Sequence, residues 1–391
     1  MNTKKFKTGT EIIERDNGKL KGVWLGGLDL GYSGVKLFAP NKVSRFPSYA
    51  VRIDEEIQYL SGAPKASIMY KDNTTGEMWL VGELAQTQMA GTVSDESERG
   101  MYGRDRYDDP MFNVVAASSL GMMMLENGFG HPSTDRIIIQ TGLPEGYLED
   151  APLLIGALAK DYDFSLKVAD GEWKNFKFTV KPDDVYVMSQ PKGSLFSICI
   201  QNDGTFHPDA GKYIASNAII FDPGFGTFDI FIVNNGAVVK GDTAQNLGMR
   251  RVFHDTCLKI KEKYGVSVSV PELQKYLETG TVRSFDRQSL ASKECPFGNY
   301  LYDASDKICE EAISRMFKAI GGMEKIVDYN YLVVTGGTGD AWFKTISEKL
   351  KNISTLKVVP ANQNDASIPL LYSNSRGYYY YRLNKLIKEN K

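Results

Sequence analysis

The chain has 391 residues, of which 42% are hydrophobic and 24% charged, with a formal net charge of −2 at pH 7. A broad basic face for nucleic acid is therefore not indicated, and the length suits roughly two to three domains. Four scattered cysteines without a Cys-x-x-Cys pair argue against structural zinc and favour a reduced compartment. No apolar run reaches the ~18 residues needed to span a bilayer, and the stretch up to Leu20 lacks the apolar core of a secretion signal. We expect a cytoplasmic protein that binds neither membranes nor, directly, nucleic acid.

In the first half of the chain, strand and helix patterns alternate after a loose extension over residues 1–21. Residues 52–108 are polar and rich in Gly, Asp and Glu, which predicts a small peripheral subdomain. Asp109 and Pro110 are suited to the N-cap and first position of a helix. The expected strands are 24–30, 35–40, 45–51, 136–141, a pair within 161–187, and 185–188, and the expected helices are 110–127, 145–160 and 190–201.

The second half continues this alternation. A returning strand is expected over 228–233, and residues 245–330 are expected to be mainly helical, with helices at 251–264 and 305–320. The remaining expected elements are a strand over 331–335, a helix over 341–351 capped by Asp340, a strand over 356–360 and a helix over 376–388. Strands that alternate with helices predict the α/β class.

A glycine-rich segment occurs twice, as Asp29-Leu30-Gly31-Tyr32-Ser33-Gly34-Val35-Lys36 and as Asp222-Pro223-Gly224-Phe225-Gly226-Thr227-Phe228-Asp229. Each copy follows an apolar run and predicts a β-hairpin whose glycine-rich tip opens on an aspartate. One such turn is common in hairpins. Two matched turns indicate two related domains that present glycine loops to one ligand, for which a phosphate chain with a metal ion is the obvious candidate.

The first loop offers the backbone N–H groups of residues 31–35, from Gly31 to Val35, together with the Ser33 hydroxyl. Successive amides and a hydroxyl can cradle phosphate oxygens, and glycine permits the close approach. Lys36, at the start of the returning strand, would place its ammonium on the terminal phosphates. The alternative is a tight hairpin with a surface lysine, which is the commoner outcome for a single short glycine motif.

The second loop offers Gly224, Phe225, Gly226 and Thr227, and Asp222 would face Asp29 across a cleft. Magnesium keeps several waters and often needs only one or two carboxylates nearby. We therefore expect Asp29 and Asp222 to hold a hydrated Mg²⁺, with Asp222 also able to orient an attacking water. For either aspartate alone, a turn residue that caps its own loop is an equal alternative.

A third glycine cluster, Gly336-Gly337-Thr338-Gly339, is expected between a strand and a helix. A helix N-terminus favours an anion, and flat glycines let an adenine ring lie on the backbone. The cluster lacks the Lys-Ser/Thr of the P-loop, and the spacing of a dinucleotide fold is absent, which argues against those two nucleotide folds. A plain turn between strand and helix is the alternative.

The order of these segments resembles the actin, sugar-kinase and Hsp-type chaperone ATPase superfamily, from about Trp24 to Tyr381. The resemblance implies two ribonuclease-H-like domains that flank a nucleotide cleft, each with a smaller peripheral subdomain. Domain I would span residues 22–195 with its periphery near 45–108. Domain II would span residues 196–375 with a mainly helical periphery near 250–325, and residues 376–391 would form a helix that returns to domain I.

The resemblance also implies two segments that connect the domains, at residues 189–193 and 310–321. In the first, Gln190 occupies the position where the superfamily places a Glu or Gln that positions the hydrolytic water. A glutamine is no strong base, but it can donate and accept hydrogen bonds as the water-orienting glutamine of GTPases does. A polar residue at a helix start is an equal alternative for Gln190.

Within the superfamily, the chain is most similar to the bacterial plasmid-segregation actins of the ParM/StbA type. Three short segments carry this likeness: Thr141-Gly142-Leu143-Pro144, Asn246-Leu247-Gly248, and Asn374-Ser375-Arg376-Gly377-Tyr378. Gly248 would thereby lie beside the nucleotide sugar.

The likeness implies an ATPase that binds ATP with Mg²⁺, with GTP as the alternative nucleotide. It further implies dynamic filaments of this chain and a DNA-bound adaptor protein of the ParR type, for segregation of a plasmid or another replicon. The alternatives on the same fold are a small-molecule kinase and a non-polymerising, chaperone-like nucleotide-binding module.

Overall fold

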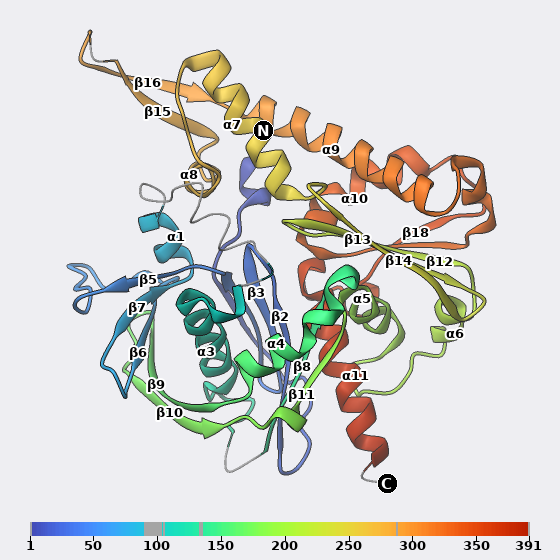
Figure 1. Cartoon of the computed structure of the whole chain (residues 1–391), viewed down its shortest axis with the longest axis horizontal. Coiled ribbons are helices and arrows are strands. Elements are labelled where there is room, and N and C mark those ends of the chain that lie inside the picture. Colours follow the sequence, from blue (N-terminus) through green and yellow to red (C-terminus); the bar gives the residue numbers. More distant parts are fainter. Residues whose placement is uncertain (1, 90–103, 105, 133–135, 287, 390–391) are drawn as a thin grey trace.

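The computed structural model describes residues 2–89, 104, 106–132, 136–286 and 288–389 of the chain. These residues form two α/β lobes, each built on a central sheet, with further elements at the periphery of each lobe (Figure 1). Residues 90–103, which belong to the expected peripheral subdomain, lie outside the described part of the chain.

The first lobe is built on a six-stranded sheet in the order β1-β4-β3-β2-β8-β11. Strands β2, β3 and β4 form an antiparallel meander, and β8 and β11 continue the sheet parallel to β2. Central β2 is buried along almost its whole length, as its apolar sequence predicts. The bounds are β1 Glu11–Glu14, β2 Val23–Leu30, β3 Gly34–Ala39, β4 Lys42–Pro47, β8 Arg136–Leu143 and β11 Val185–Ser189.

The second lobe repeats this arrangement in a five-stranded sheet with the order β14-β13-β12-β17-β18. Strands β12, β13 and β14 form the antiparallel meander, and β17 and β18 run parallel to β12. The bounds are β12 Ala218–Pro223, β13 Thr227–Asn234, β14 Ala237–Gln245, β17 Tyr331–Val334 and β18 Lys357–Pro360. Two sheets with one topology confirm the expected fold class of two ribonuclease-H-like units.

Helices α5 (Gln190–Cys199) and α11 (Ser373–Glu389) lie between the two central sheets. One hydrophobic core joins side chains from both sheets and both helices, including Ile138, Ile198, Ile220 and Tyr379. The C-terminal helix packs against β2, β3 and β8, so the end of the chain returns to the first lobe. Helices α3 (Pro110–Met124) and α4 (Ala151–Leu158) also belong to the first lobe (Figure 1).

The periphery of the first lobe is a second sheet, in the order β10-β9-β6-β7-β5, with helix α1 (Glu83–Met89) beside it. Its strands are β5 Ala50–Ile53, β6 Ile68–Asp72, β7 Met78–Val81, β9 Asp161–Val168 and β10 Lys174–Thr179. The second lobe carries α6 Ala210–Ile214, α7 Met249–Tyr264, α8 Val270–Tyr276, α9 Gly298–Ala319, α10 Gly336–Leu350 and a hairpin of β15 Thr281–Asp286 and β16 Ala291–Pro296. This hairpin projects away from the rest of the molecule (Figure 1).

Several expected elements differ from the structure. The strand expected over 45–51 is two strands, because the chain turns at Ser48 and Tyr49 from the central sheet into the peripheral one. The helix expected over 145–160 begins as a 3-10 turn, Glu145–Asp150, before α4. The mainly helical segment 245–330 contains the β15–β16 hairpin, and β14 was not expected. None of the described helices is both long and apolar enough to cross a membrane.

The extension over residues 1–21 is not loose where it is described. It contains a 3-10 turn, Thr3–Phe6, and strand β1, which pairs antiparallel with β4 at the edge of the first central sheet. Only two of its residues are large and apolar on the strand, Ile12 and Ile13, so the local pattern was too short to predict the pairing.

Candidate functional site

The two glycine-rich hairpin tips meet across a cavity of about 360 Å³ between the lobes. The β2–β3 tip comes from the first lobe and the β12–β13 tip from the second. The ring of Tyr32 packs so closely on the other tip that a Cβ on Gly226 would lie 3.2 Å from its Cδ2. Arg106 covers the same ring, with its guanidinium carbon 4.5 Å from the ring centre. The repeated segments of the sequence are thus neighbours in space.

On the first wall, Asp29 lies directly across the hairpin from Lys36, and the Lys36 ammonium is 3.4 Å from its carboxylate. Gln190, the first residue of α5, donates from Nε2 to Asp29 Oδ1 at 3.4 Å. The tip is held by Ser48, whose hydroxyl donates to the Gly31 carbonyl at 2.7 Å. A Cβ on Gly31 would lie 2.9 Å from the Lys36 Nζ, so glycine leaves room for this side chain to reach the cavity.

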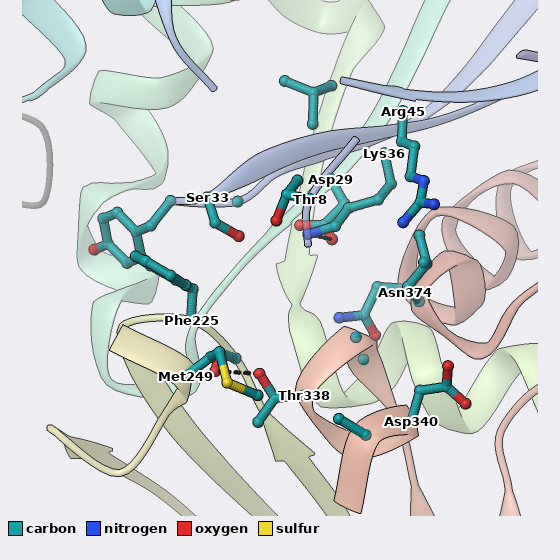
Figure 2. Close-up of a pocket in the computed structure, with 18 of the residues that line it drawn as sticks. Thr8, Asp29, Ser33, Lys36, Arg45, Phe225, Met249, Thr338, Asp340 and Asn374 are labelled. Atoms are coloured by element: carbon teal, nitrogen blue, oxygen red, sulfur yellow. Dashed lines mark hydrogen bonds and ion pairs between the residues drawn. The ribbon is translucent and has the colours of Figure 1, made fainter. Parts of the chain in front are cut away.

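On the second wall, two carbonyl oxygens of the hairpin tip accept hydrogen bonds from residues of α7 and α10. The Gly224 carbonyl accepts from the Met249 amide at 3.2 Å and from the Thr338 hydroxyl at 2.8 Å. The Phe225 carbonyl accepts from the Arg250 amide at 2.9 Å. Figure 2 shows Thr8, Asp29 and Lys36 on one side of the cavity and Met249 and Thr338 on the other. The N-terminus of α7 and the first turn of α10 therefore fix the second tip.

Asp222 lies at the floor of the cavity and is 5% exposed. The Asn374 amide donates to its Oδ2 at 3.0 Å, and the Ser194 hydroxyl contacts both Asn374 and Thr335. Burial raises the pKa of Asp222 to about 6, an effect that the Asn374 hydrogen bond opposes and the nearby Asp29 carboxylate adds to. A cation bound nearby would favour the ionised form of Asp222 and so offset the effect of burial on its pKa.

Asn374 was not among the site residues expected from the sequence, although it opens the segment that resembles the ParM ending. It lies in the first turn of α11, far along the chain from Asp222. The only signal in the sequence was that short segment, which carries no information on what its asparagine contacts. The structure adds Arg45, Arg106, Asp340 and the N-terminal residues 4–8 to the lining in the same way.

Asp229 is the counterpart of Lys36 in the second hairpin, since it lies directly across from Asp222. It is fully buried and accepts hydrogen bonds from the hydroxyls of Thr227 at 3.2 Å and Thr243 at 2.5 Å. Burial and then the charge of Asp222 raise the pKa of Asp229 to about 7. The pair of aspartates on β12 and β13 therefore resists carrying two negative charges in the absence of a cation.

This pKa gives a test of the site in the absence of any ligand. The folded chain keeps the Asp229 proton up to about pH 7, whereas an unperturbed Asp has lost it above its ordinary value of 3.8. Because the folded state binds more protons in this window, stability falls as the pH rises from about 4 to about 7. We expect Asp229→Asn to remove roughly 2–4 kcal/mol of this loss. Urea unfolding of both proteins at pH 5 and pH 8 measures it, and identical pH dependence would contradict the buried ionisation.

The third glycine cluster forms the start of α10. Gly336 has a φ of 77°, a region that favours glycine, and a Cβ there would lie 3.0 Å from Asp222 Oδ1. Helix α10 begins at Gly336 with Thr335 in the N-cap position, so the prediction that Asp340 caps a helix from residue 341 was wrong. Asp340 instead lines the cavity, and burial raises its pKa.

Most of the site residues predicted from the sequence line this one cavity. They are Asp29, Gly31, Tyr32, Ser33, Lys36, Gln190, Asp222, Gly224, Phe225, Thr227, Gly336, Gly337 and Thr338. The other three each adjoin residues of the lining: Gly34 is next to Thr8, Gly226 next to Tyr32, and Gly248 next to the Gly224 and Phe225 carbonyls.

The donor set fits a hydrated magnesium ion better than a tightly caged metal. Among the described residues, no group of three or more His, Cys, Asp or Glu side chains is arranged to hold a metal. Asp29 and Asp222 nevertheless both line the cavity, and Mg²⁺ is commonly bound through one or two carboxylates, waters and substrate phosphates.

Comparisons with known proteins agree with the architecture. Residues 27–193 match the model of the family described as the actin like proteins N terminal domain. The chain has the actin-like fold. A ParM from a 15-stranded filament of Clostridium botulinum superposes with a TM-score of 0.67 at 20% identity, covering 93% of the actin-like chain and 99% of that ParM.

Two further actin-like structures show the same fold. An archaeal actin homologue in complex with ADP has a TM-score of 0.61 at 17% identity, with 92% of this chain and 99% of that one covered. The actin-like protein Alp7A has a TM-score of 0.59 at 15% identity, with 94% and 97% covered. A search of curated protein sequences finds no match.

Proposed function

We propose that this actin-like chain binds Mg-ATP between its lobes, hydrolyses it, and assembles into filaments whose turnover depends on the nucleotide. One observation carries the proposal: the two matched hairpins, with Asp29 and Asp222 at their bases, face each other across a single cavity. An ADP complex of an archaeal actin homologue with this fold supports a nucleotide as the ligand.

In this proposal the amides of Gly31 to Gly34, the Ser33 hydroxyl and the Lys36 ammonium bind phosphate oxygens from the first wall, and Gly224 to Thr227 from the second. Asp29 and Asp222 hold the hydrated magnesium, which when bound neutralises charge on the phosphates. Gly336, Gly337 and Thr338 face the adenosine, with Gly248 supporting the second tip from behind.

Gln190 is proposed to orient the attacking water. Its Nε2 already donates to Asp29, so the carbonyl oxygen of the same amide is left to accept from a water. A residue of this kind positions water without taking its proton, so we expect slow hydrolysis that follows cleft closure.

The charge of the cavity suits a triphosphate. Lys36, Arg45 and Arg106 line it together with Lys4, Lys5 and Lys7, against Asp29, Asp222 and Asp340. Lys4, Lys7 and Arg45 pair with Glu278, Glu83 and Glu11, so Lys5, Lys36 and Arg106 are the lining cations that favour an anionic ligand at this place.

We extend the proposal to the biological setting on the likeness to ParM. The proposed partners are further copies of this chain in a filament and a DNA-bound adaptor of the ParR type, for segregation of a plasmid or another replicon in the cytoplasm. The ParM of Clostridium botulinum is described as a filament, which supports self-assembly on this fold. We propose domain boundaries at 22–195 and 196–375, with residues 376–391 forming a helix that returns to domain I.

Sedimentation of the purified chain tests the proposal. We expect ATP with Mg²⁺ to move a large share of the protein into the pellet and to raise light scattering, whereas EDTA with ATP should not. A parallel series with GTP determines the preferred base, and phosphate release without any added hydroxyl acceptor separates an ATPase from a kinase. A chain that stays monomeric at high concentration with every nucleotide would refute filament assembly.

A further inference from the structure

Residues 2–14, which we call the N-terminal strap, run between the two lobes (Figure 1). The strap begins against the helices of the second lobe and ends as β1 at the edge of the first central sheet. Between these ends, residues 4–8 line the same cavity as the two hairpin tips. The function proposed above uses the strap only for charge in the cavity lining and assigns no role to the way the strap joins the two lobes.

At its first end, the strap is anchored in the second lobe. Phe6 is 6% exposed and packs in the hydrophobic core of that lobe, edge-on to Tyr302 of α9 with ring centres 5.4 Å apart. The Thr3 hydroxyl donates to the Leu277 carbonyl at 2.6 Å, and the Tyr302 hydroxyl donates to the Asn2 carbonyl at 3.0 Å. The buried aromatic ring and the two hydrogen bonds together fix this end of the strap to the second lobe.

At its second end, the strap is part of the first lobe. Strand β1 pairs with β4 over its whole length, from Glu11 opposite Arg45 to Glu14 opposite Lys42. The Arg45 guanidinium lies 3.2 Å from the Glu11 carboxylate. The strap is therefore fixed to both lobes. To detach from the first lobe it has to break the pairing of β1 with β4, and to detach from the second it has to withdraw Phe6 from the core.

The middle of the strap joins the peripheries of both lobes. The Lys7 ammonium lies 2.7 Å from Glu83, the first residue of α1, and 3.6 Å from Glu278, just after α8. Helices α1 and α8 are themselves in contact, although they belong to different lobes. Lys7 is 26% exposed and Glu83 22%, so water screens this pairing only in part.

The strap also touches the first phosphate loop. Thr8 lies so close to Gly34 that a Cβ on this glycine would be 2.9 Å from Thr8 Cγ2. In Figure 2 the Thr8 side chain lies beside Asp29, facing the cavity. A ligand that moves the loop would therefore move the strap as well.

We propose that the N-terminal strap is a third wall of the nucleotide site, which retains bound nucleotide by joining the two lobes across the cleft. This inference rests on the proposed function, because the retained ligand is Mg-ATP. Separation of the lobes at α1 and α8 has to break the Lys7 pairs or pull Phe6 from its pocket, so the strap slows opening and nucleotide release.

The test is release of a fluorescent ATP analogue, chased with excess unlabelled ATP in the presence of Mg²⁺. We expect Lys7→Met, which keeps the apolar stem, to speed release roughly three- to tenfold. The matched control is Lys21→Met, at an exposed lysine in the turn before β2. Lys7→Met and Glu83→Gln should be non-additive in the double variant, because each breaks the same ion pair.

A second variant addresses the anchor. Phe6→Ala should speed release at least as much as Lys7→Met, with Phe129→Ala, at a ring that is 53% exposed, as its control. Thermal unfolding shows whether each variant folds, and Thr3→Val replaces Phe6→Ala if that variant does not.

Three outcomes are distinct. A wild-type chain that binds no nucleotide refutes the proposed function. A wild-type chain that binds, with strap variants that release at the wild-type rate, refutes the strap alone. Strap variants that bind faster and release more slowly would make the strap an obstacle to the ligand, which also overturns the inference.

Discussion

Replacing Asp222 with alanine should lower magnesium-dependent ATP hydrolysis by at least about a hundredfold. Asp222 lies opposite Asp229 on the hairpin, receives the Asn374 amide, and is approached within 3.0 Å by the position of a Cβ on Gly336. The second hairpin, α11 and α10 thus converge on this one carboxylate. Without the Asp222 carboxylate, Asp29 alone remains of the two carboxylates that are proposed to hold the magnesium. Phosphate release at saturating ATP and Mg²⁺ is the measurement.

The controls separate charge from packing. Asp54→Ala, at an exposed carboxylate outside the cavity, should hydrolyse ATP as the wild-type chain does. Gln190→Ala should slow hydrolysis while nucleotide affinity is kept, because Gln190 is assigned to the water and not to the phosphates. If Asp222→Ala retained wild-type turnover, the proposed role of Asp222 in magnesium-dependent hydrolysis would be wrong. Unchanged turnover in Gln190→Ala would leave the water without a positioning residue.

The hairpins could be predicted from the sequence because hairpin formation is local. The turn residues and the flanking apolar strands of each copy lie within a few positions of each other, so the pattern itself encodes the fold of the segment. The repeat of that pattern then indicated two related units, and the matching topologies of the two central sheets confirm this. The same reasoning located β17 before its glycine cluster, because a β-branched run directly precedes it.

Other features depend on contacts between distant residues, which no local pattern contains. The sequence Glu11-Ile12-Ile13-Glu14 is too short to identify as a strand, and it becomes one only by pairing with β4. Asn374 reaches Asp222 because α11 returns between the sheets, and Phe6 finds its pocket on α9. The strap was therefore expected as a loose extension although it connects both lobes.

The start of α10 was also predicted wrongly, because the glycine cluster was expected to be a turn and is the first turn of the helix. Asp340 was expected to be the N-cap of a helix that starts after this cluster. The structure starts the helix at Gly336, where a φ of 77° and close contact with Asp222 and Pro223 favour glycine. Tertiary packing outweighs propensity here, because the first turn of the helix has to approach the cavity.

Gly248→Ala should lower the affinity for Mg-ATP at least about tenfold and destabilise the fold by about 1–3 kcal/mol. A Cβ at this position would lie 2.5 Å from the carbonyl oxygens of both Gly224 and Phe225. Those oxygens already accept hydrogen bonds from the start of α7 and from Thr338, and backbone cannot swing aside as a flexible side chain can. The second hairpin tip would have to move away from α7, and with it the amides proposed to bind phosphate.

The matched control is Gly211→Ala in helix α6, where an added Cβ meets no atom within 4 Å. That change should leave nucleotide affinity unaltered and stabilise the chain by roughly 0.5–1 kcal/mol, as alanine does in place of glycine within a helix. Titration calorimetry with Mg-ATP and urea unfolding measure the two quantities on both variants. Wild-type affinity in Gly248→Ala would mean that the second tip tolerates displacement, and the cradle formed by the two matched hairpins would then not be what binds the phosphates.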